Sequence, residues 1–174
     1  MKRILSAAPL AWLIPAILVL TAGCGYRLVG KQVSLPGGGT ELDLPLLKNK
    51  TLEAGLEDLV SQELRKHLLA DGRIRLSSDA PVELRGVITG VTRTPMSFSS
   101  LGRVNVERER ITAEFRLVRK AGGEALWESG ELSADEEYPV TADPLETERA
   151  RERALREAAE DLAGTALELL LGNF

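Results

Sequence analysis

Few residues in this chain could perform chemistry, because its 174 residues include one cysteine and one histidine. An enzyme needs a nucleophile, a base or a metal ion held in a fixed geometry. His67 stands near the end of an expected helix, and we expect it to cap that helix rather than act as a base. A zinc site of the usual kind needs further histidines or thiols, and the sequence has no glycine-rich phosphate loop. We therefore predict no metal site, no cofactor and no catalytic residue; a hydrolase that uses carboxylates alone is the alternative.

The cysteine, Cys24, lies near the end of an uncharged stretch, residues 4–26, that follows two basic residues. A basic start, an apolar middle and small residues before a cleavage point are typical of a secretory signal. The small residues before the thiol resemble a bacterial lipobox, in which the cysteine receives a diacylglycerol and becomes the new N-terminus. Thr21 stands where leucine is usual. We predict a lipoprotein signal peptide at 1–23 and a lipidated Cys24, which anchors one domain, 24–174.

Two alternatives for this stretch stay open. It is long enough to cross a hydrocarbon core of about 30 Å, so it could be an uncleaved anchor, although Pro9 and Pro15 disfavour a continuous membrane helix. A buried structural cysteine is the other alternative, but burial of a thiol does not require small residues before it, whereas cleavage of a signal peptide does. Two or three acyl chains would anchor the domain stably in a membrane. Lipoproteins that stay at the inner membrane commonly carry aspartate after the cysteine. Gly25 stands there instead, which implies export to the outer membrane. The predicted location is therefore the outer membrane, lipid-anchored and facing the periplasm.

The charge of the chain limits its partners. Loss of Lys2 and Arg3 with the leader changes the formal net charge from −4 to −6. Nucleic-acid binding rests on basic patches that release counterions, and adhesion to anionic lipids by charge alone also needs basic residues. An acidic domain therefore argues against both.

Hydrophobic periodicity gives the expected elements. Short apolar runs and alternating residues predict strands at 41–46, 74–76, 82–93, 103–119 and 125–132. Three-to-four spacing of apolar residues predicts one helix from Leu52 to Asp71, capped by Thr51 or starting nearer Leu56, and a second from Asp143 to about Leu171. The predicted fold is α+β: a two-layer sandwich with two helices on one face of a mixed, mostly antiparallel, four- to five-stranded sheet.

Alternation also assigns faces to the strands. It places Leu46 toward the core in the first strand, and in the strand 82–93 it places Gly86 and Gly90 toward the core, leaving room for a helix. The other face of that strand carries Arg93. Residues 94–102 are expected to form a loop that exposes the apolar residues Met96, Phe98 and Leu101.

Two carboxylates complicate the strand 103–119. Ile111 and Phe115 point inward by alternation, and the same alternation places Glu107 and Glu109 inward, where buried carboxylates are costly. We therefore expect 103–109 to project beyond the helices as a ribbon wetted on both sides.

The order of several short motifs resembles the LptE family of outer-membrane lipoproteins of lipopolysaccharide assembly. The matching segments are 24–28 after the leader, 44–51 before Gly55, 82–88, Leu126-Trp127-Glu128 after a glycine turn, and the final helix from Glu148 to Leu171. The resemblance covers essentially the whole mature chain.

This resemblance implies a non-enzymatic protein whose partner is an LptD-type β-barrel. Family members plug the barrel lumen and help deliver lipopolysaccharide to the outer leaflet. A periplasm-facing scaffold or ligand-binding lipoprotein without a barrel partner is the alternative function.

Direct contact with lipopolysaccharide is a separate hypothesis. Its phosphates need guanidinium or ammonium groups, and four arginines lie on or near one ribbon: Arg103, Arg108, Arg110 and Arg116. Ordinary strand charges paired with acidic neighbours across the ladder are the alternative.

Overall fold

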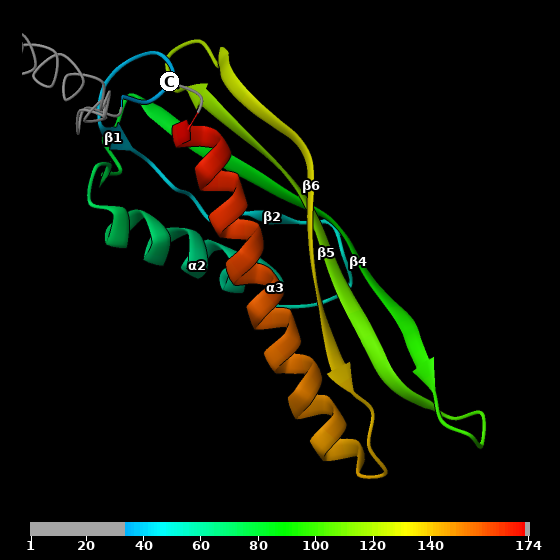
Figure 1. The fold of residues 1–174 in the computed structure, drawn as a ribbon. Coiled ribbons are helices and arrows are strands. Elements are labelled where there is room, and N and C mark those ends of the chain that lie inside the picture. The colour runs from blue at the N-terminus through cyan, green and yellow to red at the C-terminus, as the bar shows by residue number, and fades with distance from the viewer. Residues whose placement is uncertain (1–33, 173–174) are drawn as a thin grey trace, which may run out of the picture. The chain divides into compact units, whose positions relative to one another are not determined.

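A computed structural model describes residues 34–172, so Cys24, the leader and their predicted processing lie outside the described residues. The elements, shown in Figure 1, are β1 (Glu41–Leu42), β2 (Lys48–Asn49), α2 (Leu56–Asp71), β3 (Arg75–Leu76), β4 (Val82–Phe98), β5 (Val104–Arg119), β6 (Ala125–Pro139) and α3 (Pro144–Gly172). Within this part of the chain, neither helix has the length and apolar character needed to cross a membrane.

The main sheet has four strands in the order β2-β4-β5-β6. Strands β4, β5 and β6 are antiparallel, whereas β2 runs parallel to β4, and β1 and β3 form a separate parallel pair. Both helices lie on one face of the sheet, where α3 follows β5 and β6 and α2 packs beside it (Figure 1). The predicted α+β sandwich is confirmed.

The core lies between the helices and β4, β5 and β6. The inward residues of β5 are fully buried, as alternation predicts: Ile111, Ala113, Phe115 and Leu117. Burial of apolar surface at about 25 cal/mol per Å² drives this packing. In α3, three-to-four spacing predicts that Leu169 is buried. This is wrong, since Leu169 is 38% exposed and Leu167 is buried.

The long strands run further than the hydrophobic pattern indicates. Strand β4 continues through Phe98 and β6 through Pro139, so the connection between β4 and β5 is residues 99–103 and the predicted loop at 94–102 is wrong. Backbone hydrogen bonds pair β4 with β5 even in the part of the hairpin whose side chains do not reach the core, because strand pairing requires only a neighbouring strand.

A β-bulge corrects the predicted faces of β4. Ile88 pairs with Ala113, but Gly90 pairs with Thr112, so β4 has one extra residue there. An extra residue reverses the alternation beyond it. The helix face therefore carries Val91 and Arg93, and the inward position predicted for Gly90 is wrong.

The room above Gly86 is filled by the chain leading into β2. A Cβ built on Gly86 would lie 2.7 Å from Cγ of Leu47, so this side chain, rather than a helix, requires the glycine. Leu47 is buried while Leu46 is 53% exposed, because β1 ends at Leu42 and alternation does not continue through Pro45.

The ends of α2 also differ from expectation. Gly55, left-handed at φ 84°, precedes the helix, so the start near Leu56 is confirmed and Leu52, at 105% exposure, lies outside the core. The Thr51 side chain instead bonds locally, accepting from the backbone N–H of Glu53. At the other end Gly72 forms the cap by donating its N–H to the carbonyl of Leu68.

Candidate functional site

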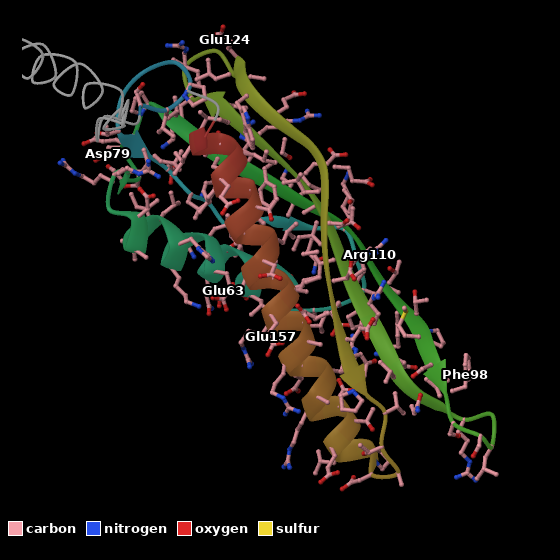
Figure 2. The ribbon with its side chains drawn as sticks, in the orientation of Figure 1. Glu63, Asp79, Phe98, Arg110, Glu124 and Glu157 are labelled. Atoms are coloured by element: carbon pink, nitrogen blue, oxygen red, sulfur yellow. The ribbon has the colours of Figure 1, made fainter. Side chains whose placement is uncertain are left out.

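The candidate site is the face of the sheet that the helices leave uncovered. Outward residues of β4, β5 and β6 form this face, which we call the open face, and it includes Arg108, Arg110 and Arg116. Figure 2 shows the side chains along these strands and labels Arg110. Alternation with the inward residues Ile111 and Phe115 predicts that these arginines point away from the core, and the structure agrees.

Two of the predicted arginines are neutralised by β6. Arg108 lies 3.1 Å from Asp135 and 2.5 Å from Glu137, and Arg110 lies 3.0 Å from Asp135. The antiparallel register sets these pairs, since Arg110 faces Asp135 and Arg108 faces Glu137. The hydrogen bond that Arg108 donates to the carboxylate of Glu137 raises the pKa of Arg108. These acids belong to Asp135-Glu136-Glu137, which sequence reasoning placed after the strand rather than within it.

The other two arginines lie apart from this cluster. Arg116 lies 3.4 Å from Glu128, and both side chains are more than half exposed. Arg103 occupies the connection between β4 and β5 and forms no ion pair within the described residues. A rise of about 3.4 Å per residue places these two arginines about 40 Å apart along the hairpin. The four arginines therefore do not form one basic patch.

A second set of basic residues joins Arg116 on the open face. They surround a cavity of about 750 Å³ whose charged lining is Lys48, Lys50, Arg85, Arg116, Glu83 and Glu114. Parallel pairing of β2 with β4 sets Lys48 beside Val87 and so brings distant parts of the sequence together. Sequence reasoning missed this patch, because a two-residue strand gives no periodic signal.

The hairpin ends in an exposed apolar group. Met96, Phe98 and Leu101 are 39%, 60% and 81% exposed, as the sequence predicts, although the first two belong to β4 rather than to a loop. Figure 2 labels Phe98 near the far end of the hairpin.

The hairpin is fixed to α3 by a buried ionic cluster. Glu109 is 1% exposed, and its Oε1 accepts from Nε of Arg93 at 2.8 Å and from Nε of Arg151 at 2.7 Å. Arg151 also donates to Glu53 and Glu148. Burial alone lowers the pKa of Arg151, but these hydrogen bonds outweigh it and raise the pKa.

This cluster corrects two expectations. The carboxylate of Glu109 is buried under α3 rather than wetted on both sides, because two guanidinium groups compensate its charge. The many Glu and Arg residues of the last helix predict a solvated face, yet the side chain of Arg151, one of them, is 11% exposed. The inward position of Glu109 could have indicated a buried ion pair in the sequence, since a buried carboxylate requires a cation to compensate its charge.

The fold is that of small bacterial lipoproteins. Lipoprotein B of Nitrosomonas europaea is similar with a TM-score of 0.55 and 17% identity, over 85% of this chain and 91% of that one. The rare lipoprotein B of Shewanella oneidensis has a TM-score of 0.53 and 19% identity, over 76% and 94%. A minor lipoprotein of Acinetobacter baumannii has a TM-score of 0.52 and 19% identity, over 77% and 92%.

The sequence itself then identifies the family. The family model for LptE, described as lipopolysaccharide-assembly, matches residues 40–167. The chain therefore belongs to the LptE family. No curated protein matches it.

Proposed function

We propose that this chain is an outer-membrane lipoprotein, anchored through a lipid on Cys24 after removal of residues 1–23. In this proposal it plugs the lumen of an LptD-type β-barrel and takes part in moving lipopolysaccharide to the outer leaflet. The role needs neither catalysis nor a cofactor. Membership of the LptE family and a fold shared with bacterial lipoproteins support it.

The observation that carries the proposal is the open face of the sheet. Large outer-membrane barrels have polar, wet interiors, so a plug needs a polar surface whose charges can stay hydrated. Charges of opposite sign alternate across β5 and β6, as between Arg110 and Asp135. Such a face can contact a polar wall without burying unpaired charge.

The basic cavity at Lys48, Lys50 and Arg116 supports contact with lipopolysaccharide phosphates. The two lysines form no ion pair among the described residues, and Arg116 has only a long, exposed one. We propose this end of the open face, rather than Arg108 and Arg110, for such contact. Reversal of charge by Lys48→Glu with Arg116→Glu should reduce lipopolysaccharide capture, and unchanged capture would contradict the assignment.

Photo-crosslinking in cells tests the barrel partner. A crosslinking amino acid at Phe98, Leu101 or Arg116 should give an adduct with an outer-membrane barrel, and Glu157 on the exposed side of α3 is the matched control. Depletion of the chain should leave lipopolysaccharide in the periplasm. Absence of any barrel adduct would favour the scaffold without a barrel, and adducts from Glu157 alone would overturn the choice of face.

Membrane fractionation tests the anchor. Cys24→Ala should release the chain from the membrane pellet, because the predicted lipid is lost. Pellet association that is unchanged by this substitution would favour an uncleaved span instead.

A further inference from the structure

Three potential metal ligands converge where α2 lies against α3. Glu63 and His67 stand one turn apart on α2, so their side chains share a face of that helix. Glu160 of α3 completes the group, and one ligand atom of each residue lies within 4.8 Å of the others. Sequence spacing could not indicate this group, because Glu160 lies far from the other two in the chain.

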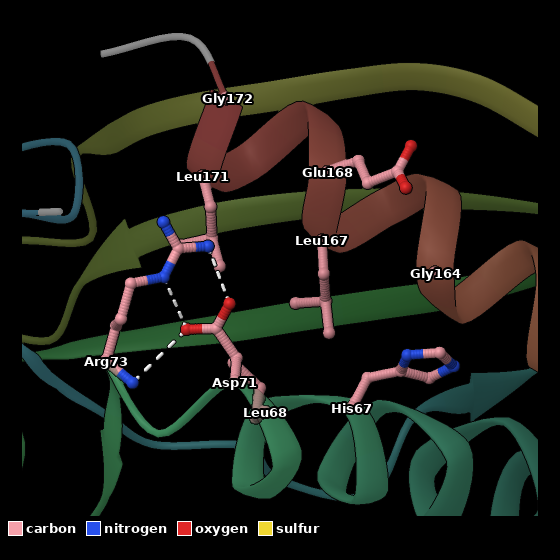
Figure 3. A pocket seen from close by; sticks show the side chains of 9 residues that line it. All are labelled: His67, Leu68, Asp71, Arg73, Gly164, Leu167, Glu168, Leu171 and Gly172. Carbon is pink, nitrogen blue, oxygen red and sulfur yellow. Dashed lines mark hydrogen bonds and ion pairs between the residues drawn. The ribbon is translucent and has the colours of Figure 1, made fainter. Parts of the chain in front are cut away.

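One ring nitrogen of His67 has no partner within residues 34–172. Its Nε2 is shielded from solvent and forms no hydrogen bond with any of these residues. A buried polar atom that is left unpaired destabilises the fold, because it loses its hydrogen bonds to water without replacement. The sequence predicted that His67 caps α2. This is wrong, since Gly72 forms the C-terminal cap. In Figure 3 the ring lies beside Gly164 and points away from Asp71 and Arg73.

A cation already joins the two carboxylates. Nζ of Lys66 lies 2.9 Å from Glu63 and 3.2 Å from Glu160. The Lys66 side chain is 59% exposed, so it can rotate into solvent, whereas the Glu63 side chain is only 11% exposed. An incoming cation therefore meets two oriented carboxylates and displaces only a surface ammonium.

We propose that Glu63, His67 and Glu160 bind one Zn²⁺ ion and thereby tie α2 to α3. Imidazole nitrogen and carboxylate oxygen are ordinary zinc ligands at about 2.0–2.2 Å. Tetrahedral ligands at that distance lie about 3.4 Å apart, so the donor atoms must approach by up to about 1.4 Å. Rotation of the exposed Glu160 side chain can supply this movement, and water takes the fourth position.

The single histidine gives a direct test. Zinc is titrated into the tag-free full chain while the ¹⁵N and ¹H signals of its only imidazole are followed by NMR, and calorimetry measures the stoichiometry. We expect one ion per chain and a shift of the Nε2 signal that saturates with it. Zinc that binds without moving the imidazole signal, or no saturable binding, would overturn the proposal.

Matched variants locate the ligands. Glu63→Gln and His67→Gln should each weaken zinc binding at least tenfold, while Glu157→Gln, which removes an exposed carboxylate of α3 outside the group, should leave it unchanged. Lys66→Ala should tighten binding severalfold, because the competing ammonium is removed, and it requires no change in the core. Equal weakening by Glu157→Gln, or no tightening by Lys66→Ala, would contradict the site.

Discussion

Removal of the Arg151 guanidinium should destabilise the fold far more than removal of any exposed arginine. Arg151→Met keeps the aliphatic stem but leaves Glu109, 1% exposed, with Arg93 alone. The variant also separates Glu53, which precedes α2, from α3. The substitution therefore tests whether the buried cluster holds the hairpin, the helix and the segment before α2 together.

The structure sets the size of the effect. Breaking a buried ion pair by removing one partner costs about 3–5 kcal/mol, and Arg93 retains part of the compensation, so we expect about 3 kcal/mol. For a domain of this size that loss lowers Tm by about 10 °C. Arg93→Met should cost about 1 kcal/mol or less, because its side chain is 46% exposed and exposed ion pairs contribute little.

Urea denaturation followed by circular dichroism measures these differences. Arg153→Met, on the exposed side of the same helix, is the control and should change the free energy of unfolding by less than about 0.5 kcal/mol. The double variant Glu109→Leu with Arg151→Met should recover much of the loss, since replacing a whole buried pair by apolar residues is often neutral.

Additivity would refute this reasoning. If the double variant loses as much free energy of unfolding as Glu109→Leu and Arg151→Met lose separately and added together, the two side chains are not coupled. A loss of less than about 1 kcal/mol in Arg151→Met would show that Glu109 is not buried against α3 in solution.

Three further predictions concern the core and its edge. Phe115→Ala should lower the free energy of unfolding by about 3–5 kcal/mol, measured by the same denaturation, because the ring is fully buried. A nearly unchanged stability would mean that Phe115 lies on the exposed face of β5. Gly86→Ala should cost about 1–3 kcal/mol, since its Cβ would lie 2.7 Å from Leu47, and Leu47→Ala should relieve part of that loss. Burial and the 2.5 Å hydrogen bond that Tyr138 donates to Glu107 raise the pKa of Tyr138. The protonated side chain therefore stabilises the fold fully below about pH 10, and this stabilisation is lost as the pH rises further. Tyr138→Phe should therefore cost about 1.5 kcal/mol at neutral pH and flatten the alkaline loss of stability; an identical pH profile in the variant would contradict this.

The sequence by itself determined the elements that depend on neighbours in the chain. Alternation at Ile111 and Phe115 assigned the buried face of β5, and the Asp143-Pro144 pair set the start of α3, where Asp143 accepts from the backbone N–H of Leu145. Such signals are local, because periodicity and capping act within one or two turns or a few strand residues. The motif order was also sufficient to indicate the family.

Only the tertiary structure decided which distant residues meet. The bulge before Gly90 turned Arg93 toward Glu109, and the register of β5 and β6 paired Arg110 with Asp135. The packing of α2 against α3 brought a ligand atom of His67 within 4.8 Å of one of Glu160. Each of these contacts depends on the register of one strand or the position of one helix against another. A one-residue shift reverses every face beyond it, so patterns read along the chain cannot determine the partners of its charged side chains.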